Sequence, residues 1–348
     1  MNRRELLAVS AAAGGGLLLG RSGVASAAAS TATGPSKVMV GALAYGTCPC
    51  VGTIQIGCHN AAELVCWKFQ GILSPAINQD AVNLNQTYQL AIALKPAAIC
   101  GGMWFPTAAT QASVALKDGI YFIAINTGDN AFLAANPQVS YVGQNLYNGG
   151  VLAGGLICAQ LLKDGKKTGV ILSGDTSPGS VVTVERYGGI VAGTKAFNKA
   201  HGTTFTNQDF PDMSADLAQS IPVYKTKITQ LGSSLVALAN TTTQTSTANI
   251  KIAQELGWKP GQYVLGGFDT AAVISQAIES GYTLFTLDQQ FFEQGFMAVM
   301  QAWQKLERGF NPPAIYDTGN AVITKANVKT VAARDTAIAT LGSRYGIG

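Results

Sequence analysis

Apolar runs of the length of buried strands recur along the chain from residue 36 onward, and amphipathic stretches separate them. A continuous apolar run without alternation is typical of a strand that is covered on both faces of a parallel sheet. Strands that alternate with helices in this way form parallel sheets through right-handed crossovers. The pattern therefore predicts an α/β protein. The predicted strands are 37–45, 96–100, 120–126, 168–173, 234–240, 263–269 and 283–288.

Helical spacing of apolar residues marks the stretches between these strands, and the chain after residue 309 returns to an extended pattern. The number of strands is too large for one doubly wound sheet of ordinary domain size, so we expect two lobes, near 36–140 and 141–288. No linker rich in proline and serine separates them, which favours several short crossings over a single tether. The predicted helices are 57–73, 149–165, 187–200 and 293–309, and 313–324 is expected to be extended.

The first residues have the pattern of a secretory signal. Arg3 and Arg4 precede an apolar stretch over 6–20, and small residues follow up to Ala29. A membrane helix is the alternative, but this stretch is too short and too rich in glycine to span a bilayer. We expect residues 1–29 to be a twin-arginine signal peptide and the mature protein to be soluble and periplasmic.

Charge is scarce in this chain. Only 12% of its 348 residues are charged, against about 25% in an average protein. The net charge is +4 and no basic cluster occurs, which argues against a nucleic-acid partner. A surface of hydroxyls and amides would suit an acidic extracellular medium, where carboxylates protonate; drift in composition is the alternative explanation.

Six cysteines follow the signal, and an even number in an oxidising compartment suggests disulfides whose pairing the sequence leaves open. One alternative is that the pair around Pro49, together with Cys58 and His59, forms a metal or redox element. With two histidines in the chain and no second C-x-x-C, we expect no metal site, and buried thiols are the commoner fate. The cysteines are Cys48, Cys50, Cys58, Cys66, Cys100 and Cys158.

Polar side chains end two of the apolar runs, Asp269 after one and Gln289 after the next. The carboxyl ends of parallel strands meet at one edge of a sheet, which is where open α/β sheets bind small ligands. A carboxylate accepts hydrogen bonds strongly and an amide both donates and accepts, so the pair suits a hydroxylated ligand.

Four stretches, taken in order, resemble the type I periplasmic solute-binding proteins of sugar ABC transporters, the class that contains ribose-binding protein. They are YVGQNLYNGGVLAG (141–154), GVILSGDTSPGSVVTVERYGGIVAG (169–193), LVALANTTTQTSTANIKIAQELG (235–257) and GGFDTAAVISQAIESGYTLFTLDQQFFEQG (266–295). The last is the most specific, because the interval from Asp269 to Gln289 matches two ligand-contacting positions of the family.

The resemblance implies two doubly wound parallel-sheet lobes joined by a three-segment hinge, with crossings near residues 140, 289 and 318. The N-terminal lobe would be 36–140 plus 290–317, and the C-terminal lobe 141–289 plus 318–345. It also implies a monomeric binding protein, without cofactor or enzyme activity. Such a protein closes on a small neutral sugar, polyol or cyclitol and delivers it to an ABC import permease.

Eight residues are candidates for ligand contact, some by resemblance and some by their place at strand ends. Five of them have a plainer alternative. Asp269 would cap the helix after it, Gln289 would be a hinge contact, Asn126 would form a turn, Trp104 would pack, and Arg186 would hold its own loop. The candidates are Asp269, Gln289, Asn240, Thr241, Asn126, Arg186, Trp104 and Tyr45.

Two departures from the ribose-binding pattern remove charge. Val184 stands where relatives carry a ligand-contacting arginine, two residues before Arg186. The sequence NTTT at 240–243 replaces the usual Asn-Asp, which leaves Asn240 and Thr241 as competing candidates. Ribose itself is therefore in doubt, and another neutral polyhydroxylated ligand is favoured.

Other classes of protein share this two-lobe fold. A LacI-type regulator would need an N-terminal helix-turn-helix, where this chain has its signal. A hydrolase would need a second acid near Asp269, and no G-x-S-x-G, phosphate-loop or H-E-x-x-H motif occurs. A chemoreceptor-coupled sensor differs only in its membrane partner and stays an alternative.

Overall fold

The computed structural model describes residues 37–45, 48–74, 80–214 and 216–347. The expected signal peptide, 1–29, lies outside the described residues, in the unit Met1–Pro35; the fold below belongs to the unit Ser36–Gly348. No helix in the described part of the chain is both long and apolar enough to cross a bilayer.

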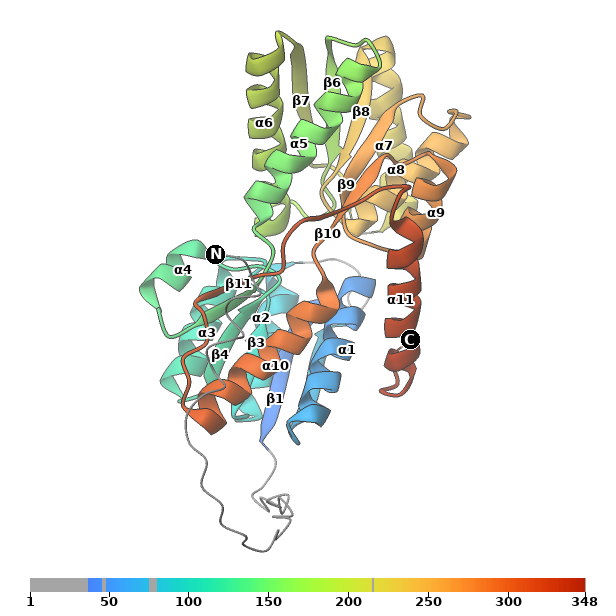
Figure 1. The fold of residues 1–348 in the computed structure, drawn as a ribbon. Coiled ribbons are helices and arrows are strands. Elements are labelled where there is room, and N and C mark those ends of the chain that lie inside the picture. The colour runs from blue at the N-terminus through green and yellow to red at the C-terminus, as the bar shows by residue number, and fades with distance from the viewer. Residues whose placement is uncertain (1–36, 46–47, 75–79, 215, 348) are drawn as a thin grey trace, which may run out of the picture. The chain divides into compact units, whose positions relative to one another are not determined.

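Two six-stranded sheets form the framework of the described residues (Figure 1). The first sheet is parallel throughout. In spatial order it consists of β11 (Ile315–Asp317), β5 (Ser140–Gly143), β4 (Tyr121–Ile125), β3 (Ala98–Gly101), β1 (Val38–Tyr45) and β2 (Lys68–Ser74). The second is parallel except for β12, which runs antiparallel to β10. In spatial order it consists of β12 (Ala321–Ile323), β10 (Phe285–Asp288), β9 (Val264–Phe268), β8 (Leu235–Asn240), β6 (Thr168–Gly174) and β7 (Thr204–Phe210).

Helices accompany both sheets, so the α/β class and the pair of parallel-dominated sheets predicted from the sequence are confirmed. The first sheet carries α1 (Pro49–Leu64), α2 (Ala81–Ala93), α3 (Thr107–Lys117), α4 (Asn130–Ala135) and α10 (Phe291–Arg308). The second carries α5 (Leu146–Lys163), α6 (Val181–His201), α7 (Leu217–Leu231), the short 3-10 helix η1 (Gly232–Ser234), α8 (Thr243–Glu255) and α9 (Ala272–Ser280). The chain ends in α11 (Val328–Ser343).

The helix predicted over 57–73 is wrong in its second half. Helix α1 ends at Leu64, and Cys66 has φ +57°, in the left-handed region that does not continue a helix. Strand β2 follows, with Phe69 buried. Strands β5 and β7 were also missed. β7 is an edge strand that buries only Phe205 fully, so it lacks the continuous apolar run that marks the central strands.

The chain passes between the sheets three times: between β5 and β6, between β10 and α10, and between β11 and β12. Strand β5 pairs with β4 in the first sheet, so the expected boundary at 140/141 falls inside a strand and the first passage follows Gly143. The other two passages follow Asp288, the last residue of β10, and Asp317, the last residue of β11.

Helix α11 contacts elements of both sheets, whereas the sequence placed it with the second alone. At its start, Val328 packs in one apolar cluster with Ile274 of α9. At the other end, Tyr345 donates a hydrogen bond of 2.8 Å from Oη to Oε2 of Glu63 on α1 and stacks on His59. The C-terminal helix therefore bridges α9 and α1.

Candidate binding site

Asp269 and Gln289 follow neighbouring strands, β9 and β10, and their side chains meet. Gln289 Nε2 donates to Asp269 Oδ1 over 2.7 Å. Asp269 has φ +73°, a left-handed conformation that aspartate tolerates better than most residues. Both side chains are buried. The two strand ends thus present one hydrogen-bonded carboxylate–amide pair at this edge of the second sheet.

The second oxygen of Asp269 lies at the start of α8. Oδ2 accepts hydrogen bonds from the backbone N–H and the hydroxyl of Thr243, over 3.1 and 3.0 Å. Helix α9, which follows Asp269 in sequence, instead has Ala271 at its N-cap and no side-chain cap. Asp269 therefore does not cap the helix after it, and the positive end of α8 favours its charge.

Arg186 supplies the opposite charge. Its Nη2 lies 3.4 Å from Asp269 Oδ1 and 3.0 Å from Gln144 Oε1, while Nη1 donates to the carbonyl of Thr241 over 2.6 Å. The guanidinium lies over the ring of Phe268. Burial lowers the pKa of Arg186, and the charge of Asp269 opposes that shift. The pair is electrically neutral as a unit and holds α6 to the ends of β8 and β9.

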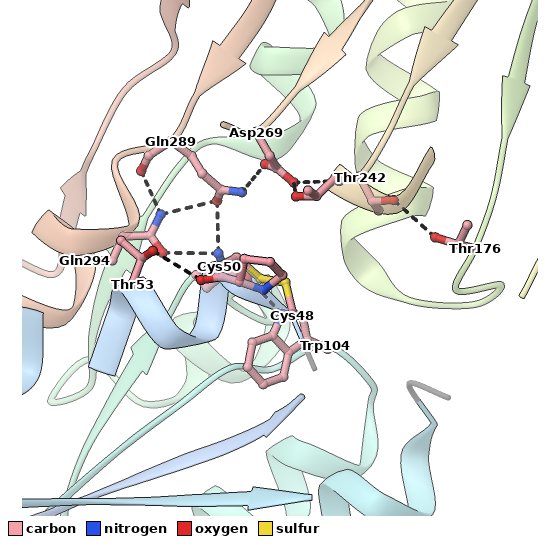
Figure 2. Close-up of a disulfide and its surroundings, with 12 residues drawn as sticks. Cys48, Cys50, Thr53, Trp104, Thr176, Thr242, Asp269, Gln289 and Gln294 are labelled. Carbon is pink, nitrogen blue, oxygen red and sulfur yellow. Dashed lines mark hydrogen bonds between the residues drawn. A yellow bond between two sulfur atoms is a disulfide. The ribbon is translucent and has the colours of Figure 1, made fainter. Parts of the chain in front are cut away.

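Asn126 brings the first sheet to this cluster. It follows β4 with φ +63°, and its Nδ2 donates to Gln289 Oε1 over 3.0 Å and to Gln294 Oε1 over 3.1 Å. Its Oδ1 accepts from Trp104 Nε1 over 2.8 Å. A continuous hydrogen-bonded chain therefore runs from Trp104 through Asn126 and Gln289 to Asp269 (Figure 2).

Three further polar residues belong to the cluster and were missed by the sequence reasoning. Gln294, on α10, donates to the side-chain and main-chain oxygens of Gln289. Gln144 accepts from Arg186, and Thr243 bonds Asp269. The one available signal was Gln294, one of two glutamines on the mostly apolar buried face of α10 that includes Phe291 and Ala298.

Some predicted residues lie elsewhere. The side chain of Asn240 bonds Asn249 within α8, and the hydroxyl of Thr241 donates to the carbonyl of Gly174, so neither side chain bonds Asp269. Val184 is 59% exposed. Tyr45 ends β1, but its side chain lies outside the described residues.

The second sheet also touches the first beside Trp104. The backbone N–H of Val181, at the start of α6, donates to the carbonyl of Trp104 over 2.9 Å, and Val182 packs against the apolar core of the first sheet. The candidate residues of the two sheets are therefore flanked by a direct contact between them.

A family model described as a periplasmic binding protein domain matches residues 55–309. The chain belongs to the periplasmic binding protein family. This family consists of binding proteins rather than enzymes. A comparison with curated protein sequences found no match.

Solved structures of low sequence identity share the fold of this binding protein. A carbohydrate transporter protein from Acidothermus cellulolyticus, in complex with myo-inositol, has a TM-score of 0.70 at 20% identity, over 86% of this chain and 97% of its own. A solute-binding protein from Burkholderia graminis, with D-arabinose, has a TM-score of 0.71 at 20% identity, over 84% and 96%. One from Agrobacterium vitis, with tagatopyranose, has 0.70 at 20% identity, over 85% and 96%.

Proposed function

We propose that this protein captures a small neutral sugar, polyol or cyclitol between the ends of its two sheets and delivers it to an ABC import permease. The observation that carries the proposal is the hydrogen-bonded chain from Asn126 to Asp269, which joins polar groups of both sheets through Gln289. Each of these groups can exchange its protein partner for a ligand hydroxyl, because an amide donates and accepts and a carboxylate accepts.

Charge balance supports a neutral ligand. Asp269 is paired with Arg186 inside the cluster, so a charged ligand would leave one buried charge without compensation. The ligands in the three related structures, myo-inositol, D-arabinose and tagatopyranose, are uncharged and rich in hydroxyls. Trp104 offers an indole on which the C–H face of a sugar can pack.

The contacts of Asp269 do not favour catalysis. Within the described residues its carboxylate contacts Arg186, Thr243 and Gln289, and no second carboxylate bonds it. A glycoside hydrolase needs two carboxyl groups flanking the scissile bond. We therefore propose binding and transport without chemical conversion of the ligand. We also propose that the protein acts as a monomer.

A thermal-shift screen of the mature protein against sugars, polyols and cyclitols tests the proposal. A ligand that binds only the folded state at about 100 times its Kd adds about 2.7 kcal/mol of stability. We expect at least one neutral polyol to raise the Tm of the native protein and to raise that of the Asp269→Ala variant clearly less. A response only to anionic or cationic compounds would contradict the neutral-ligand assignment.

Closure on the ligand is the accompanying test. A ligand held from both sheets binds the closed form better than the open one, and that difference in affinity is what shifts the equilibrium. Small-angle scattering is expected to give a smaller radius of gyration with saturating ligand than without it. Identical profiles would contradict capture by closure.

We further propose that the protein works in the periplasm, exported by the twin-arginine route. The double substitution Arg3→Lys with Arg4→Lys is expected to retain the precursor in the cytoplasm. A precursor that still reaches the outside in the variant would exclude this route.

A further inference from the structure

A disulfide joins Cys48 and Cys50, which only Pro49 separates, at the first turn of α1. Trp104 and Gln294 are among the residues around it (Figure 2). The other four cysteines, including the exposed Cys66, are free thiols. The one bond therefore does not belong to a framework of disulfides that staples the fold.

A disulfide across so short a loop gives little structural stability. Cross-linking stabilises a protein mainly by restricting the unfolded chain, and this effect grows with the number of residues in the closed loop. Cys48 and Cys50 are two positions apart, so the restriction is close to its minimum. The Cys48–Cys50 bond therefore contributes little to the stability of the fold.

The position of the pair favours its reduced form. Cys48 is the N-cap of α1, a helix of 16 residues, and it makes no side-chain capping bond. No acidic residue lies in the first turn. A thiolate at a helix N-terminus is stabilised by the helix dipole and the free amides, which lowers its pKa. A more stable thiolate makes the disulfide easier to reduce and Cys48 a better leaving group.

A reactant can also reach the pair. Cys50 is half-buried, and Cys48 lines a cavity of about 1430 Å³ together with Pro49, Thr53 and Gln290. The buried thiols Cys58 and Cys100, by contrast, are inaccessible in the folded protein. Access at the half-buried Cys50 and thiolate stabilisation at Cys48, which is itself buried, thus coincide in one disulfide.

We propose that the Cys48–Cys50 pair is a thiol–disulfide exchange site that a dithiol reduces. One thiolate of the dithiol attacks Sγ of Cys50, the Cys48–Cys50 bond breaks, and Cys48 leaves as a thiolate at the helix N-terminus. The second thiolate of the dithiol then attacks the other sulfur of the same molecule, which is now bonded to Sγ of Cys50, and so releases Cys50. The dithiol is oxidised to a disulfide, and its two protons and two electrons pass to Cys48 and Cys50.

Native alkylation tests the proposal with dithiothreitol as the dithiol. The purified protein is titrated with dithiothreitol without denaturant, alkylated and analysed by peptide mass spectrometry. The Cys66→Ser background removes the exposed free thiol. We expect Cys48 and Cys50 to become alkylated together while the circular dichroism stays native. In a reduced sample freed of dithiothreitol, we expect incubation with oxidised glutathione before alkylation to protect the pair again. Alkylation of the pair only after unfolding, or failure to re-form the bond, would overturn the proposal.

A matched pair of variants tests the role of the helix N-terminus. Thr53→Asp places a negative charge near the start of α1, and Thr53→Asn is its neutral counterpart. We expect the aspartate to slow reduction by about two- to fivefold, the size of a charge effect at a helix terminus, and the asparagine to leave the rate unchanged. Equal rates in both variants would overturn the assignment of Cys48 as the stabilised thiolate. None of these readouts depends on the transported ligand.

Discussion

Gln289 donates a hydrogen bond of 2.7 Å to Asp269, twenty positions earlier in the chain, and so links the ends of β10 and β9. The same amide accepts from Asn126 of the first sheet. The cluster is therefore built around one glutamine that faces both sheets. The side chains of Asn126, Gln289 and Asp269 are bonded to one another, which means that a ligand must exchange partners with them. Nε of Arg186 is the exception in the described cluster, because it is buried without a hydrogen-bond partner.

The Asp269→Ala variant is expected to bind ligand at least tenfold more weakly. Loss of a hydrogen bond to a charged group costs about 1.5–3 kcal/mol. Isothermal titration calorimetry with a ligand from the thermal-shift screen measures the change, and the exposed Asp118→Asn serves as control. Because Asp269 also pairs with buried Arg186, Gln289→Leu provides a second variant that keeps the ion pair. Unchanged Kd in both would remove this pair from the site.

Substitution by leucine is expected to have different effects at two glutamines on the buried face of α10. Gln294 bonds Gln289 and Asn126, so Gln294→Leu leaves those amides short of partners and weakens ligand binding. The side-chain amide of Gln301 is buried without a hydrogen-bond partner among the described residues. Gln301→Leu is therefore expected to stabilise the protein by about 1–3 kcal/mol in urea unfolding and to leave binding unchanged. A destabilised Gln301→Leu variant would contradict this reading of α10.

The buried carboxyl of Asp175 predicts a pH dependence. Burial raises the pKa of Asp175 above its ordinary value, although the backbone N–H of Ser177 and the hydroxyl of Thr183 oppose the shift, and the charge of Asp209 adds to it. The folded protein then holds this proton more tightly than the unfolded chain, whose aspartates titrate near pH 3.9. The contribution of Asp175 to the stability of the folded state is therefore complete below that pH, and it is lost as the pH rises through the pKa of Asp175 in the folded protein.

Asp175→Asn removes the ionisation and keeps an oxygen that accepts from Ser177. The variant is expected to be more stable than the native protein at pH 7, and the difference is expected to vanish toward pH 3.5. Denaturant unfolding at both values measures this, with Asp118→Asn as the exposed control. A stability difference of the same size at both pH values would show that ionisation of Asp175 is not its cause.

Val184→Arg is expected to leave specificity unchanged. Relatives of the ribose-binding class carry a ligand-contacting arginine at the matching position, but here the side chain is 59% exposed near the start of α6. An arginine would add a solvated charge outside the cluster of Arg186 and Asp269. Calorimetry with ribose is expected to show no new binding, and ribose binding gained by the variant would place position 184 in the site.

The parts of the fold that the sequence predicted are those that depend on local pattern. The central strand β8 is buried along its whole length, and so is β9, which is why continuous apolar runs marked them. Edge strand β7 has one buried residue, Phe205, among exposed and half-buried residues that are mostly polar, so no such run exists there. The end of α1 depends on the backbone conformation of Cys66, which no periodicity encodes.

Some residues of the candidate site could likewise be predicted from local sequence pattern, and others could not. Asp269, Gln289 and Asn126 could be proposed as candidates because each follows a strand, and strand ends of a parallel sheet converge. Gln294 and Gln144 were missed because their role depends on which helix or loop packs against those ends. Asn240 is the last residue of a strand, yet its side chain turns toward Asn249 of α8, since position at the sheet edge does not fix the direction of a side chain.

Helix α11 is held near its middle by an ion pair of 2.6 Å between Arg334 and the buried Asp288, and at its C-terminal end by exposed Arg344 beside Glu63. Any separation of the two sheets must therefore loosen one of these contacts. Charges exposed to solvent are screened by salt over about 10 Å at 0.1 M, so the stiffness of the hinge becomes a function of ionic strength. The apparent affinity for an uncharged ligand would then vary with the salinity of the medium, although the ligand itself carries nothing for salt to screen.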